Sequence, residues 1–195
     1  MESTIIERGL FADDVHQQMI AYLDEQIPYL PVGRDTDNFT RRYMHNNPWF
    51  VHVHGQLTEL ASELCGEKLK PSYSFLSMYD EYGICPLHID NKRQCYRTLD
   101  YLIRQSPDEP WPLYVGGLMT DEEVAWIGHA GQPGTVEGIE QVKRDTDWNV
   151  VNLMPNDAVI YSGTHSWHYR DRLSEGTADL VFFHFVSEDF DGDLN

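Results

Sequence analysis

The spacing of apolar residues in the first third of the chain predicts two helices. In the first, over residues 11–27, the apolar side chains recur at helical spacing, at Val15, Met19, Ile20 and Leu23. Asp13 and Asp14 stand before them and can cap the helix N-terminus. The second helix is expected over about 51–65, because Gly66 follows it and glycine commonly terminates helices.

From Lys70 onwards the pattern changes to short runs rich in β-branched and aromatic residues. The runs are SYSFLSMY, CYRTLDYLI, WPLYVGG, VAWIG, WNVVNLM, AVIYSG and ADLVFFHFV. Gly, Pro, Asn and Asp separate them, which is typical of antiparallel strands in a sandwich or an open barrel. We therefore expect an α+β, mainly β fold whose N-terminal helices pack on one sheet.

A single domain is expected for the 195 residues. We divide it into a helical N-terminal support over 1–69, a β core over 70–187 and an acidic, frayed tail over 188–195. Two further stretches, 35–47 and 128–147, are predicted to be loops long enough to act as lids that set substrate selectivity.

The composition favours a cytoplasmic protein that does not span a membrane. No apolar run reaches the length of a membrane helix, and acids stand near the N-terminus where a secretion signal would carry basic residues. The three cysteines, Cys65, Cys85 and Cys95, form no CxxC pair, so neither a disulfide framework nor a cysteine zinc site is expected.

The formal net charge of −18 bears on the choice of partners. Such a chain repels nucleic-acid phosphates and anionic lipid surfaces, so we expect neither nucleic acid nor a membrane as a partner. A small molecule or a peptide is the expected substrate. An anionic ligand would need local positive charge, which makes the arginines near any proposed site important.

Two histidines and one aspartate form the candidate metal site. His88 and Asp90 are two residues apart, and on an extended strand such residues point to the same face. This pair alone is weak evidence for a metal. A second histidine-bearing segment, NDAVIYSGTHSWHYR at 156–170, adds His168. Two histidines and a carboxylate make the facial triad that holds Fe(II) and leaves coordination positions open.

Over about 70–186 the sequence resembles the 2-oxoglutarate/Fe(II)-dependent dioxygenase superfamily, particularly its prolyl-hydroxylase-like branch. The segment Tyr79-Asp80-Glu81-Tyr82-Gly83 resembles the tyrosine and glycine that precede the metal motif in that branch. The segments CYRTL and WPLYV resemble the next two strands of its fold. The resemblance implies a double-stranded β-helix, a jelly-roll or cupin-like architecture.

The resemblance also implies Fe(II) and 2-oxoglutarate as cofactor and cosubstrate. Tyr79 resembles the family tyrosine that hydrogen-bonds the far carboxylate of 2-oxoglutarate, and Thr98 is assigned with it to cosubstrate binding. Many relatives carry an Arg or Lys about ten residues after the distal histidine, but that position here is Ala178. Arg170, two residues beyond His168, is our preferred replacement. Arg172 and Arg97 are the other candidates.

The distal ligand is open between His168 and His165. We prefer His168 because the HYRDRL that it begins resembles the corresponding ending in some relatives, whereas His165 follows a Gly-Thr turn. The other histidines are expected to be structural or exposed. His52 and His54 in particular lie in a predicted helix, where residues two apart point in different directions.

The expected activity is hydroxylation of a small molecule, an amino acid or a peptidyl residue, with release of succinate and CO2. Asp90 occupies the place that would otherwise hold a halide, which favours hydroxylation over halogenation. Two alternatives stay open. A cupin-type isomerase or dioxygenase would not use 2-oxoglutarate and would usually carry a third His or a Glu near the first ligands. A catalytically inactive binding module is supported by Ala178.

Overall fold

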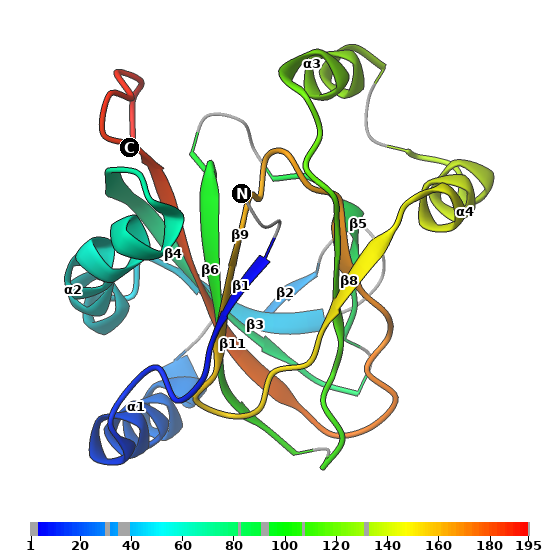
Figure 1. The fold of residues 1–195 in the computed structure, drawn as a ribbon. Coiled ribbons are helices and arrows are strands. Elements are labelled where there is room, and N and C mark those ends of the chain that lie inside the picture. Colours follow the sequence, from blue (N-terminus) through cyan, green and yellow to red (C-terminus); the bar gives the residue numbers. More distant parts are fainter. Residues whose placement is uncertain are drawn as a thin grey trace.

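Two antiparallel sheets and four α-helices make up the part of the chain described by the computed structural model (Figure 1). The structure describes residues 4–29, 32–34, 40–81, 83–90, 94–106, 108–130 and 133–194. The mainly β, α+β class expected from the sequence is confirmed. No helix within the described ranges is both long enough and apolar enough to cross a membrane.

The larger sheet has the strand order β1-β9-β6-β11-β4-β3-β2. Its strands are β1 (Thr4–Glu7), β2 (Val32–Arg34), β3 (Thr40–His45), β4 (Leu69–Tyr79), β6 (Arg97–Gln105), β9 (Ala158–Tyr161) and β11 (Ala178–Ser187). The smaller sheet has the order β5-β10-β7-β8. Its strands are β5 (Cys85–His88), β7 (Leu113–Gly116), β8 (Trp148–Val151) and β10 (His168–Arg170).

Both predicted N-terminal helices are present, with corrections at their starts. Helix α1 (Asp13–Gln26) has Ala12 as its N-cap residue, so Asp13 and Asp14 do not cap it. They lie in its first turn, where acids complement the helix dipole. Helix α2 (Pro48–Cys65) begins at Pro48, because the Asn47 side chain caps it, and Gly66 ends it in the left-handed conformation as predicted. The short 3-10 helix Ile27–Tyr29 follows α1.

Two apolar layers result from the alternation of side chains along the strands of the larger sheet. One layer fills the space between that sheet and helices α1 and α2, and it includes Met19, Leu23, Phe50, Leu99 and Phe183. The other lies between the two sheets and includes Tyr79, Leu102, Leu113, Val151 and Leu180. The helices therefore cover one face of the larger sheet, and the inner face is left for the smaller sheet and the site.

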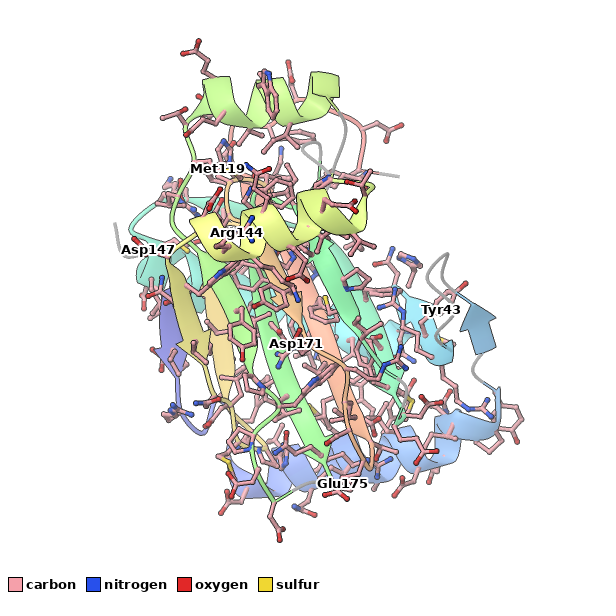
Figure 2. The ribbon with its side chains drawn as sticks, turned by 90° about the vertical axis from the view of Figure 1, so that its right-hand side faces the viewer. Tyr43, Met119, Arg144, Asp147, Asp171 and Glu175 are labelled. Carbon is pink, nitrogen blue, oxygen red and sulfur yellow. The ribbon has the colours of Figure 1, made fainter. Side chains whose placement is uncertain are left out.

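Two predicted segments of the second half have a different structure. The run VAWIG belongs to helix α3 (Asp121–Ala130), because Val124 and Ile127 pack on Ile89 from one helix face. The predicted loop 128–147 contains helix α4 (Val136–Asp145), whose N-cap Thr135 accepts from the Gly138 N–H. Helices α3 and α4 lie at the opposite end of the molecule from α1 (Figure 2).

The N-terminal third also supplies strands, which the expectation of a purely helical support missed. β1 pairs with β9, while β3 pairs with β4 inside the stretch 35–47 that was predicted to be a loop. Residues 35–39 of that stretch lie outside the described part. The correction matters for the site, because β3 extends the inner face of the larger sheet by one strand that carries Arg41 and His45.

Candidate metal centre and its cavity

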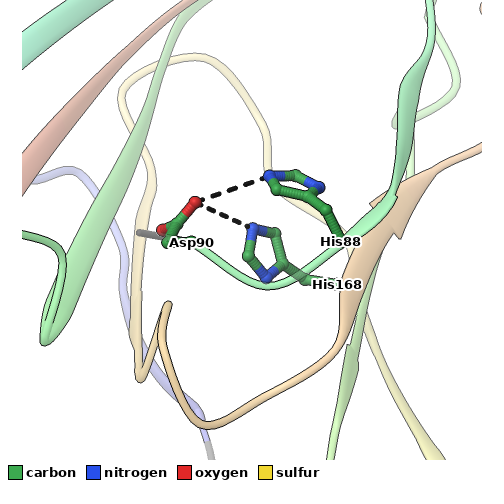
Figure 3. A group of neighbouring side chains, drawn as sticks. All are labelled: His88, Asp90 and His168. Atoms are coloured by element: carbon green, nitrogen blue, oxygen red, sulfur yellow. Dashed lines mark ion pairs between the residues drawn. The ribbon is translucent and has the colours of Figure 1, made fainter. Parts of the chain in front are cut away.

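The structure brings the three predicted metal ligands together. His88 ends β5, Asp90 follows two residues later, and His168 begins β10 directly opposite His88 in the sheet register. The Nε2 atoms of His88 and His168 lie 3.4 and 3.6 Å from Asp90 Oδ1 (Figure 3). The ligand atoms of all three residues lie within 4.8 Å of one another. They converge on one point, as a shared metal ion requires.

Backbone carbonyls orient both imidazole rings. His88 Nδ1 lies 2.7 Å from the carbonyl oxygen of Pro86, and His168 Nδ1 lies 3.0 Å from that of Ser166. A carbonyl oxygen only accepts, so each Nδ1 carries the hydrogen and donates it. The lone pair of a neutral ring is then on Nε2, the atom that faces Asp90. Metal-binding histidines are commonly held in this tautomer by such a hydrogen bond.

Asp90 is held from its other oxygen. The hydroxyl of Thr98, on β6, donates to Asp90 Oδ2 at 3.0 Å, and the Asp90 N–H donates to the carbonyl of Gly163 at 2.8 Å. Gly163 packs so closely that a Cβ atom there would collide with the Asp90 carboxylate and lie 2.6 Å from Thr98 Oγ1. Thr98, which was predicted to contact the cosubstrate, thus supports a metal ligand in this structure.

The electrostatics of the site favour an ionised aspartate. Burial alone would raise the pKa of Asp90, but the His168 and His88 rings, which in their protonated form attract the carboxylate and donate to it through Nε2, hold that pKa well below its usual range. His184, on β11, lies 3.0 Å from Thr98 Oγ1 and 3.9 Å from Asp90. Burial lowers the pKa of His184 to about 4, so this neighbouring ring is neutral at pH 7.

A second group of possible ligands overlaps the first. The ligand atoms of Asp90, Cys95 and His184 also lie within 4.8 Å of one another. Because this group shares Asp90 with the triad, it does not form a separate site with three ligands of its own. Cys95 is buried and lies 3.2 Å from the hydroxyl of Tyr73.

A cavity of about 610 Å³ lies beside the triad, between the two sheets. Its polar lining includes Arg41, Tyr79, Asp100, Tyr161, Arg170 and His184. Its partly buried aromatic lining includes Tyr73, Phe75 and Phe182. Of the residues predicted to bind the cosubstrate, Tyr79 and Arg170 therefore line this cavity.

Arg170 is buried and has a carboxylate partner. Its Nη2 lies 2.8 Å from Asp100 Oδ2, and its Nη1 donates to the carbonyl of Trp111. Asp100 is fully buried, and burial raises the pKa of its carboxyl while Arg170 opposes that rise. The second oxygen of Asp100 has no hydrogen-bond partner among the described residues.

The other candidate arginines of the sequence lie elsewhere. Arg97 is paired with Glu67, and neither Arg97 nor the exposed Arg172 is among the residues that line the cavity. Arg41 was missed by the sequence analysis because it lies in the polar stretch predicted as a loop. It lines the cavity and donates to the hydroxyl of Tyr79 at 2.8 Å. The only signal for it was the two-residue alternation of Arg41, Tyr43 and His45.

The structure separates the histidines that the sequence left open. His165 Nε2 lies 2.9 Å from Asp121 at the start of α3, outside the triad, so the geometry favours His168 as the distal ligand. His52 is exposed, whereas His54 is buried against the rings of Phe183 and Phe185. The two rings point apart, as expected for a helix.

The burial of His54 predicts an acid-sensitive fold. Burial, with the charge of His184, lowers the pKa of His54 to about 3. Between that value and the ordinary value near 6.5 the unfolded chain binds the additional proton, so stability falls as the pH falls. His54→Leu should remove up to about 1.4 kcal/mol of this loss per pH unit. Urea unfolding between about pH 6 and pH 5 measures it. The exposed His52→Leu is the control, and equal slopes for both variants would contradict the prediction.

Comparison with known proteins gives matches in structure but not in sequence. No protein-family model and no curated protein sequence matches the chain. The non-heme alpha-ketoglutarate-dependent epimerase SnoN of nogalamycin biosynthesis superposes with a TM-score of 0.73 at 12% identity, over 95% of this chain and 79% of its own. A prolyl-4-hydroxylase from Pseudomonas putida superposes with a TM-score of 0.64 at 8% identity, over 94% and 92% of the two chains.

The chain has the fold of the 2-oxoglutarate/Fe(II)-dependent dioxygenases. This confirms the fold family that the sequence motifs indicated. HygX from Streptomyces hygroscopicus, whose structure was determined with nickel, 2-oxoglutarate and hygromycin B bound, also shares this fold. It superposes with a TM-score of 0.66 at 12% identity, over 96% of this chain and 84% of its own. At such low identities the likeness establishes the architecture, and the chemistry must be argued from the site.

Proposed function

We propose that this protein is an Fe(II)- and 2-oxoglutarate-dependent oxygenase with a double-stranded β-helix core formed by its two sheets. The observation that carries the proposal is the convergence of His88, Asp90 and His168 at the wall of a cavity between the two sheets. The reaction we propose is hydroxylation, with release of succinate and CO2.

The donor set fits Fe(II). Two imidazoles and one carboxylate are the ligands of the facial triad, and both rings already have their Nε2 atoms directed at the shared point. When bound, Fe(II) and 2-oxoglutarate supply the activation of O2 and the oxidation of the substrate. The protein's own part is to fix the rings through the carbonyls of Pro86 and Ser166, and to orient Asp90 through Thr98.

Two of the four residues predicted to bind the cosubstrate, Tyr79 and Arg170, line the cavity. The Tyr79 hydroxyl is a hydrogen-bond donor of the kind that carboxylates bind, whereas the Arg170 guanidinium donates to Asp100 and to the carbonyl of Trp111. Thr98 acts in this proposal through Asp90. Arg172 is exposed and is not among the lining residues, so we no longer assign it to the cosubstrate.

The cavity also favours a small-molecule substrate. Its volume of about 610 Å³ is that of a site for a small ligand, and it exceeds what a short diacid alone would fill. The partly buried rings of Tyr73, Phe75 and Phe182 suit a substrate with a flat apolar part. An amino acid or a peptidyl residue stays within the proposal. The exclusion of nucleic acid and the cytoplasmic location remain predictions from the sequence.

Anaerobic titration with Fe(II) and 2-oxoglutarate tests the proposal. The wild-type protein should develop the weak visible charge-transfer band of the iron–2-oxoglutarate chelate, and His168→Ala should not. His165→Ala is the matched control, because His165 lies outside the triad, and it should keep the band. Succinate release then serves to screen candidate substrates.

The outcomes of this titration separate the alternatives. Tight metal binding without the band would overturn the role of 2-oxoglutarate and favour a cupin-type enzyme. Failure of the wild type to bind metal would overturn the proposal altogether and favour a binding module. Loss of the band in His165→Ala but not in His168→Ala would show that the distal ligand is misassigned.

A further inference from the structure

The position that usually holds the far carboxylate of 2-oxoglutarate has no charge in this chain. Ala178, at the start of β11, is fully buried and offers only a methyl group. A dicarboxylate entering a buried cavity needs a compensating cation, because an isolated charge is costly to desolvate. The following inference rests on the proposed function and concerns which residue supplies that cation.

The sheet register points to a residue two strands away. Ala178 pairs with Tyr79 on β4, and Tyr79 pairs with Arg41 on β3. The three residues therefore form one row across adjacent strands, at the same height in the sheet. Neighbouring strands are separated by about 4.8 Å, a step that a long arginine side chain can span.

The side chain of Arg41 extends over β4. Its Nη1 donates to the Tyr79 hydroxyl at 2.8 Å and to Ser77 Oγ at 3.1 Å. Its guanidinium carbon lies 4.8 Å from the ring centre of Phe75 and 5.5 Å from that of Tyr79. The charge thus lies beside the tyrosine that the family resemblance assigns to the far carboxylate, and Arg41 itself lines the cavity.

The charge of Arg170 is balanced by Asp100. Its guanidinium binds Asp100, and the side chains of the two residues are only 3% and 0% exposed, so the pair is neutral within the protein. Burial raises the pKa of Tyr79 to about 12, so its hydroxyl keeps its hydrogen at pH 7. A guanidinium beside a phenol is a donor set suited to a carboxylate.

We infer that Arg41, together with Tyr79, binds the carboxylate of 2-oxoglutarate that is remote from the metal. Arg170 balances the charge of Asp100 and does not bind this carboxylate of 2-oxoglutarate. The cation that we infer lies on β3, in the same row across the sheet as Ala178 on β11.

Binding without turnover tests this assignment. Fe(II)-loaded protein is titrated anaerobically with 2-oxoglutarate and with 2-oxovalerate, which has a methyl group in place of the far carboxylate. The wild type should bind 2-oxoglutarate at least about 10-fold more tightly, as expected for charge-assisted hydrogen bonds. Arg41→Met should lose this preference while its affinity for 2-oxovalerate stays unchanged.

Three further variants make the comparison specific. Arg42→Met is the matched control, since Arg42 is adjacent on β3, donates to the carbonyl of Ile27 and is not among the cavity-lining residues. It should keep the wild-type preference. In the Arg41→Met/Ala178→Arg variant, an arginine at the usual family position should restore it. Arg41→Lys, which keeps the charge, should retain part of it and replaces the methionine variant if that one does not fold.

The failure of this inference is distinct from failure of the proposed function. If the wild type gives no chelate band with either acid, the proposed function fails. If both acids give the band but Arg41→Met and Arg41→Lys keep the full preference, only the assignment of Arg41 is overturned. If only the charge-balanced Arg170→Met/Asp100→Leu variant loses the preference for 2-oxoglutarate over 2-oxovalerate, the far carboxylate is bound by Arg170.

Discussion

Gly163→Ala is expected to lower the affinity for Fe(II) by up to about 100-fold, the upper end of the range for losing groups that orient a metal ligand. The reason is steric, because the new Cβ atom would collide with the Asp90 carboxylate and crowd the hydroxyl of Thr98. The carboxylate must turn away from the two Nε2 atoms that it faces. Anaerobic titration with Fe(II), followed by calorimetry or fluorescence, measures the loss.

Gly117→Ala is the control for this substitution. A Cβ atom at Gly117, just after β7, would have no neighbour within 4 Å, so this variant should bind Fe(II) like the wild type. Unfolding curves of both variants check that the fold is retained. Wild-type Fe(II) affinity in Gly163→Ala would mean that Asp90 does not need its present position to hold the metal.

Arg170→Met is expected to destabilise the protein by about 3–5 kcal/mol, the usual cost of leaving one member of a buried ion pair without its partner. Arg170 and Asp100 are almost completely excluded from solvent, and Arg170 donates directly to Asp100 Oδ2. Removing the guanidinium leaves a carboxylate inside the protein with neither charge compensation nor a donor for that oxygen. Urea unfolding gives the change in the free energy of unfolding.

The double variant Arg170→Met/Asp100→Leu distinguishes an ion pair from simple packing. It should recover most of the lost stability, because no buried charge remains. Arg144→Met is the exposed control, since Arg144 and its partner Asp145 are 69% and 60% exposed, and it should cost less than about 1 kcal/mol. A double variant as unstable as Arg170→Met would assign the effect to the volume of the arginine side chain.

Two of the three candidate metal ligands could be grouped from the sequence because His88 and Asp90 lie two residues apart on an extended segment. His168 lies in a second histidine-bearing segment far along the chain, and the preference for it over His165 came from the family resemblance of HYRDRL. The pairing of β10 with β5 then shows that the His168 ring faces Asp90.

Arg41 shows what the sequence could not provide. Strand β3 is short and polar, and it is a strand because β4 offers it a partner edge, which is a tertiary cause with little local signal. The sequence shows that Ala178 carries no charge. Arg41, the residue that we infer to replace it, lies more than 130 residues away in the chain, and the sheet register brings it into the same row.

Helix α3 was missed for a related reason. The five residues VAWIG are too few to distinguish a helix from a buried strand by periodicity.

The pairing of β1 with β9 also has a consequence for the order of events in folding. Thr4 lies opposite Tyr161, and the strand that begins at His168 follows only after β9. Closing so long a segment is entropically costly, and chains dominated by such distant contacts fold slowly. During synthesis the first two ligands emerge long before the third. A nascent chain that has not yet reached His168 holds only two of the three candidate ligands, so the proposed metal site is complete only after β10 has been synthesised.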